Sequence, residues 1–108
     1  MIPRPLRADP KALFAAKSRI VRFPWAAARF GSIEGEGQIA VIVPKKAAKL
    51  SVDRHLAKRR VSAAMLPLRI PGVAIAITLT AAGAKGRGNE LRAWCQELRE
   101  RILEATND

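Results

Sequence analysis

The chain has 108 residues, of which 49% are apolar, and its 20 Lys or Arg against 9 Asp or Glu give a net charge of +11. This length suits one domain over residues 1–108 that buries roughly 60–70% of its unfolded surface, and the apolar share excludes general disorder. No apolar run approaches the roughly 18–20 residues of a membrane span, and no apolar segment of a secretory signal is expected.

The first half of the chain predicts one helix and three strands. Asp9 and Pro10 are typical of a helix start, and the helix is expected to run through residue 16. Two strands are predicted over residues 19–23 and 25–30, divided at a proline that cannot donate to a sheet ladder. A turn-rich connection then leads to a third strand over residues 38–43.

A second helix, from about Ser51, has a narrow apolar stripe. At 100° per residue the stripe consists of Ala57, Val61, Ala64 and Leu68. Pro67 disturbs the end of this helix, and Pro71-Gly72 leads into a fourth strand over residues 73–79. The loop over residues 81–88 contains three glycines without the signature of a phosphate-binding loop, so we expect a flexible hinge.

The last helix starts near Asn89 and completes the fold. Its apolar face carries Leu91, Trp94, Cys95, Leu98, Ile102 and Ala105, and we expect Trp94 to be structural. Cys95 is expected to be a small buried side chain, and a single cysteine fits a reducing cytoplasm. The sequence therefore predicts an α/β fold of the α+β type: a two-layer α/β sandwich, order α-β-β-β-α-β-α, with a four-stranded sheet.

The positive charge is concentrated in one part of the chain. Residues 1–60 hold 14 Lys or Arg against 4 acids, whereas residues 61–108 hold 6 against 5. Residues 45–60 alone hold seven cations against Asp53. Such a segment indicates that the chain binds a polyanion. Nucleic-acid phosphates are the commonest partner, because each neutralised phosphate releases counterions. A merely solvated charged face is the alternative interpretation, but it predicts scattered charge.

The segment over residues 42–60 resembles the signature of the bacterial ribonuclease P protein component, V-S-K-K-x-x-K-x-A-V-x-R-N-R-x-K-R-x-x-R-E. The matching positions are Lys45, Lys46, Lys49, Val52, Arg54, Lys58 and Arg59. Pro71-Gly72 before a strand and the closing amphipathic helix also match the family's layout, so the resemblance covers most of the chain. The departures are Pro44 for Ser, His55 for Asn, Leu56 for Arg, and Ser62-Ala63 for Arg-Glu.

The resemblance implies a ribosomal S5 domain 2-like fold and a subunit of a cytoplasmic ribonucleoprotein. In that family the RNA subunit is the ribozyme, an endonuclease that hydrolyses a phosphodiester to remove the 5′ leader of precursor tRNA. The implied partners are therefore the catalytic RNA and precursor tRNA, with no membrane and no DNA. No protein catalytic residue is implied, no cofactor is bound by the protein alone, and magnesium is expected at the RNA subunit.

The resemblance also implies two surfaces. The RNA-binding surface consists of Lys45, Lys46, Lys49, Arg54, His55, Lys58, Arg59 and Arg60. The cleft for the leader, between the sheet and the first helix, consists of Phe14, Trp25 and Arg29.

Several alternatives stay open at this point. His55 either donates a hydrogen bond to RNA or is an ordinary surface residue, since no Ser or carboxylate is poised beside it for catalysis. Phe14 and Trp25 either stack on a leader base or pack in the core. The chain is alternatively a stand-alone RNA-binding or ribosome-associated protein without a processing role. A protein-only nuclease would need clustered carboxylates for two metals, yet four of the nine acids lie along the last helix.

Overall fold

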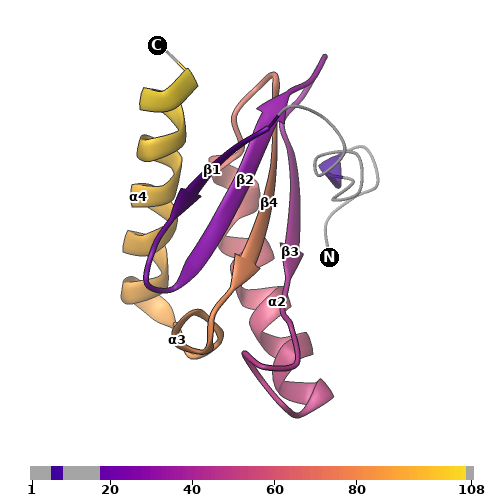
Figure 1. Ribbon diagram of the computed structural model, residues 1–108, viewed down its shortest axis with the longest axis vertical. Helices are drawn as coiled ribbons and strands as arrows, with labels where there is room; N and C mark the ends of the chain where they lie inside the picture. Colours follow the sequence, from indigo (N-terminus) through magenta and orange to yellow (C-terminus); the bar gives the residue numbers. More distant parts are fainter. Residues whose placement is uncertain (1–5, 9–17, 107–108) are drawn as a thin grey trace.

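The computed structural model describes residues 6–8 and 18–106 and contains one mixed sheet (Figure 1). Its strands are β1 (Arg19–Arg22), β2 (Ala26–Ser32), β3 (Gln38–Ile42) and β4 (Val73–Leu79), in the order β1-β2-β4-β3. The pairs β1–β2 and β2–β4 are antiparallel, whereas β3–β4 is parallel. The predicted four-stranded sheet is confirmed. The helix predicted over residues 10–16 lies outside the described residues.

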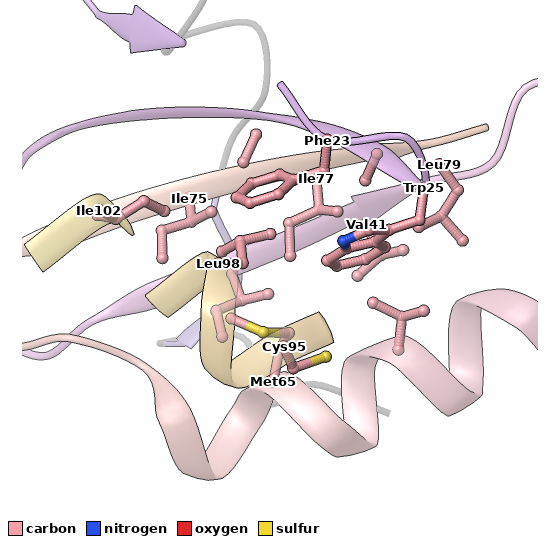
Figure 2. Packing of buried hydrophobic residues seen from close by; sticks show 14 of the residues in the cluster. Phe23, Trp25, Val41, Met65, Ile75, Ile77, Leu79, Cys95, Leu98 and Ile102 are labelled. Carbon is pink, nitrogen blue, oxygen red and sulfur yellow. The ribbon is translucent and has the colours of Figure 1, made fainter. Parts of the chain in front are cut away.

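Two long helices cover one face of this sheet. Helix α2 (Ser51–Met65) makes the crossover that two parallel strands such as β3 and β4 require. It continues into the 3₁₀ turn η2 (Leu66–Leu68), and a short helix α3 (Ala81–Ala84) precedes α4 (Gly88–Thr106). Figure 2 shows the core side chains between the sheet and the two long helices, so the predicted two-layer α+β arrangement is confirmed.

The core is built from alternate residues of the strands and one stripe of each long helix. The completely buried members include Ile39, Ile75, Ile77, Cys95, Leu98 and Ile102. Ala57 and Val61 of α2 are buried as the periodicity predicts. The next buried residues are Ser62 and Met65, while Ala64 and Leu68 are only partly buried. The α-helix ends at Met65 and the tighter 3₁₀ winding that follows changes the direction of the next side chains.

The segment predicted as a hinge is packed instead, because residues 81–84 form α3. A Cβ atom on Gly83 would collide with the carbonyl oxygen of Trp25, and a Cβ on Gly86 would collide with the indole ring of Trp94. The two indoles themselves are stacked, with ring centroids 5.4 Å apart and an interplanar angle of 13°. The hinge prediction is therefore wrong, since these glycines allow a close approach to a tryptophan pair.

The thiol of Cys95 is fully buried, and this has a consequence that can be measured. Burial raises the pKa of Cys95 from 9.0 to about 11, so its contribution to stability is present below pH 9 and lost as the pH rises through 11. At pH 8 we expect iodoacetamide to alkylate the native protein about 100-fold more slowly than the chain unfolded in guanidinium chloride. Equal alkylation rates would contradict the buried placement.

Candidate nucleic-acid interface

A short turn between β3 and α2 presents three lysines. The turn opens at Pro44, whose carbonyl oxygen accepts hydrogen bonds from the amides of Ala47 at 2.9 Å and Ala48 at 3.4 Å. Lys45, Lys46 and Lys49 are all exposed. We call these three lysines the basic turn. They precede the helix, so the seven cations of residues 45–60 are divided between a turn and a helix.

Arg54 holds the end of this turn in place. One terminal nitrogen of its guanidinium, Nη1, donates to the carbonyl oxygens of Ala48 at 3.0 Å and Lys49 at 2.7 Å. These carbonyls lie just before the first turn of α2, where no side chain caps the helix. Arg54 is thus placed to fix the conformation of the end of the basic turn, and its guanidinium still adds positive charge there.

Replacing Arg54 by lysine separates these two contributions. Arg54→Lys keeps the charge but loses the planar guanidinium whose Nη1 bonds the two carbonyls, so the turn loses order. For the variant we expect about fivefold weaker binding to structured RNA, with the slope of log affinity against log salt unchanged. A binding titration at several salt concentrations measures both quantities. A shallower slope of log affinity against log salt, with the conformation of the basic turn unchanged, would show that Arg54 contacts a phosphate directly.

The exposed side of α2 carries the rest of the predicted RNA surface. His55, Lys58 and Arg59 are exposed, whereas Arg60 is half-buried. We call His55, Lys58 and Arg59 the basic helix face. His55 and Lys58, together with Arg54, line an open hollow of about 360 Å³ against the end of β3. This hollow places positive charge beside β3, which is an edge strand of the sheet.

The cations of the two surfaces are not neutralised by nearby acids. Within the part of the chain that the structure describes, no carboxylate forms an ion pair with the basic turn or with Lys58 and Arg59. The single acid of the segment, Asp53, is exposed on the first turn of α2. Their electrostatic potential is therefore available to an anionic partner.

The structure places Trp25 in the core, which corrects its predicted position in the leader cleft. Strict alternation would put Trp25 on one sheet face with Ala27 and Arg29. A tight turn interrupts that alternation, because the backbones of Phe23 and Ala26 bond each other at 2.8 and 3.3 Å and β2 begins only at Ala26. The ring of Trp25 points toward the helices and is 2% exposed (Figure 2).

Arg29 lies on the sheet face opposite to the helices. It is half-buried, and its guanidinium donates to Ser18 Oγ at 3.0 Å. The neighbouring positions Ala40 and Ala76 are buried in a second small apolar cluster on this face. Phe14 lies outside the described residues. Of the three residues predicted for the leader cleft, the structure thus places Arg29 on the sheet face opposite to the helices and Trp25 in the core.

A second hollow was missed by the sequence analysis. It measures about 410 Å³ and lies at the end of the sheet, where Arg22 and Lys46 supply positive charge and Thr78 and Thr80 supply hydroxyl groups. Arg22 reaches this place because it pairs with Ala27, which in turn pairs with Thr78. The alternation of side chains along β1 was the sequence feature that could have pointed to Arg22. Only the strand order β1-β2-β4-β3, however, brings Arg22 near the basic turn.

No protein-family model matches the chain, and no curated protein matches it by sequence. Among solved structures, the RNase P protein of Staphylococcus aureus superposes with a TM-score of 0.73 at 13% identity, covering 91% of this chain and 94% of that chain. The chain has the RNase P protein fold. A Staphylococcus aureus RNase P protein mutant with defective mRNA degradation activity gives a TM-score of 0.69 at 14% identity over 96% and 90% of the two chains.

A third structure with the RNase P protein fold comes from another organism. The RNase P protein of Thermotoga maritima, in complex with 1-(4-fluorophenyl)-2-thiourea, gives a TM-score of 0.62 at 17% identity. The superposition covers 93% of this chain and 92% of that chain. The shared architecture therefore extends over nearly the whole of both molecules.

Two further observations concern residues 6–8 and 18–106 of this RNase P protein fold. In these ranges, no three His, Cys, Asp or Glu side chains are grouped so that they could hold a metal ion. None of the helices described there is both long and apolar enough to cross a bilayer.

Proposed function

We propose that this chain is the protein subunit of a bacterial ribonuclease P and a divergent member of that family. The proposal is supported by the fold and by the position of the positive charge on it. On a fold shared with RNase P proteins over most of both chains, the exposed lysines of one turn and the adjoining cations of one helix match the family's basic signature. The resemblance of the sequence and the likeness of the fold, found separately, lead to the same family.

The catalytic RNA binds the basic turn and the basic helix face in this proposal. Lys provides a compact charge for phosphates, and Arg adds a planar fork that can bond two phosphate oxygens. If about six of these side chains each neutralise one phosphate, log affinity falls with a slope of roughly −4 to −5 against log salt. The protein contributes charge and position, while the RNA subunit, with its magnesium ions, hydrolyses the phosphodiester.

In this proposal, the 5′ leader of precursor tRNA follows the sheet face opposite to the helices. Arg29 lies on that face, and the hollow beside Arg22 continues it to the end of the sheet. Lys46 borders this hollow and also belongs to the basic turn, so one single strand of RNA can contact both the hollow and the basic turn. An extended leader suits such a path, because its phosphates meet the cations along it.

A binding titration tests this proposal. The purified chain is titrated with the catalytic RNA of a bacterial ribonuclease P and with a random transcript of equal length, each over a range of salt concentrations. We expect the catalytic RNA to bind at least about tenfold more tightly, with the salt slope given above. Equal affinity for the two RNAs would refute the proposal and favour a stand-alone RNA-binding protein.

A further inference from the structure

The start of α2 carries an exposed apolar surface. Among the described residues, the exposed large hydrophobic side chains are Ile20 and three residues close together in the chain, Leu50, Val52 and Leu56, with exposed fractions of 63%, 59% and 44%. We call Leu50, Val52 and Leu56 the apolar ridge. Leaving three large apolar side chains in water is unfavourable, so a clustered set of them points to a contact that the isolated chain does not make.

The apolar ridge has no part in the core of the protein. The buried residues Ala57, Val61 and Met65 fix the side of α2 that packs on the sheet. At 100° per residue, Val52 lies about 180° and Leu56 about 140° from the middle of that side. The two side chains are one helical turn apart and face solvent, so neither position is explained by folding.

The charge around the apolar ridge restricts what can cover it. Lys49 precedes the ridge residue Leu50, Lys58 and Arg59 follow Leu56, and residues 45–60 together carry seven cations against one acid. A second copy of the chain would bring the same charge into the contact and be repelled. Protein interfaces are also depleted in lysine at their centres. A polyanion is the partner that this surface fits.

Phosphates alone do not account for an apolar ridge among cations. A continuous duplex presents mainly phosphates and riboses at its surface, and its stacked bases keep their faces inside. Bases that are unpaired in loops and bulges expose apolar faces, and RNA-binding proteins read such regions by packing side chains on them. The apolar ridge therefore matches folded RNA with unpaired bases better than a plain double helix.

We propose that Leu50, Val52 and Leu56 pack on unpaired bases of the bound RNA and give the cationic surface a preference for folded RNA over duplex. This inference rests on the proposed function and deepens it, because it adds a contact that does not depend on salt. The cations supply affinity for any phosphate backbone, whereas the apolar ridge discriminates between RNA architectures.

The test is a double variant, Val52→Ser with Leu56→Ser, which keeps every charge. The probes are the catalytic RNA of a bacterial ribonuclease P and an unbroken RNA duplex of about 30 base pairs, titrated between about 0.1 and 0.5 M salt. We expect about tenfold weaker binding to the catalytic RNA at each salt concentration with an unchanged slope, and less than about twofold loss on the duplex. The matched control, Ile20→Ser, removes an exposed apolar side chain from β1 and is expected to change neither affinity.

Several results would overturn the inference. An equal loss on both probes, or no loss on either, would show that the apolar ridge does not read unpaired bases. Sedimentation that shows a dimer of the wild-type chain, dissolved by the double variant, would assign the ridge to a contact between copies. If the double variant unfolds, a second variant at a position before the helix, Leu50→Ser, takes its place. It is expected to weaken binding to the catalytic RNA by about threefold and to leave binding to the duplex unchanged, and the absence of this loss would equally overturn the inference. Failure of the wild-type chain to prefer the catalytic RNA over a random transcript would instead refute the proposed function itself.

Discussion

Replacing the three lysines of the basic turn by glutamine is expected to reduce the affinity for the catalytic RNA by about 100-fold at physiological salt. Lys45, Lys46 and Lys49 are exposed on one turn, so three phosphate contacts are lost together. Each lost contact also removes one released counterion, and the slope of log affinity against log salt is expected to become shallower by about 2 to 3. Titrations of the wild-type chain and the triple variant with the same RNA measure both effects.

The control for this experiment is a second triple variant with the same net charge. Lys85→Gln, Arg87→Gln and Arg92→Gln remove three exposed cations around the start of α4 that belong neither to the basic turn nor to the basic helix face. We expect this variant to lose less than about threefold in affinity and to keep the slope, because only the overall field changes. Equal losses in the two triple variants would show that net charge, and not the basic turn, determines binding.

Replacing Leu98 by alanine is expected to lower the free energy of unfolding by about 2–5 kcal/mol. Leu98 is completely buried between α4 and the sheet, so the shorter side chain leaves a cavity as well as losing apolar burial (Figure 2). For a domain of this size, we expect the melting temperature to fall by roughly 10–30 °C. Chemical unfolding followed by circular dichroism gives the free-energy change directly.

The same substitution at an exposed leucine provides the comparison. Leu56→Ala removes the same atoms from a side chain that is 44% exposed, so we expect the free energy of unfolding to change by no more than about 0.5 kcal/mol. RNA binding is expected to respond in the opposite way, because it depends on the exposed Leu56 and not on the buried Leu98. Leu98→Ala, measured well below its melting temperature, is expected to bind the catalytic RNA like the wild-type chain. A larger stability loss at Leu56 than at Leu98 would contradict the described core.

The elements that were predicted correctly have a strong local pattern in the sequence. Strand β4 occupies Val73–Leu79 as predicted, because a short apolar run that follows Pro71-Gly72 and has a polar end is typical of a buried strand. Helix α2 begins at Ser51 as predicted, and the buried face of α4 includes Leu91, Cys95, Leu98 and Ile102. In each case the periodicity of one segment determines which side chains are buried.

The features that were missed depend on turns and on the order of strands. Trp25 was misplaced because it lies in a tight turn before β2, which begins only at Ala26, so its side chain does not follow the alternation of Ala27 and Arg29. The hollow beside Arg22 needs β4 to lie between β2 and β3, which no local pattern reveals. The packed glycines Gly83 and Gly86 likewise depend on a tryptophan pair formed by residues far apart in the chain. The predicted RNA contacts of the basic turn and the basic helix face stay predictions.

Reconstitution of leader cleavage tests the central claim most directly. The chain is mixed with the catalytic RNA of a bacterial ribonuclease P and a precursor tRNA, at a magnesium concentration too low for the RNA to act alone. We expect the mixture to release the 5′ leader at a rate well above that of the RNA alone, and the triple variant of the basic turn to lose most of this gain. A cleavage rate that is the same with and without the wild-type chain would contradict the proposal that this protein serves the RNA as its subunit.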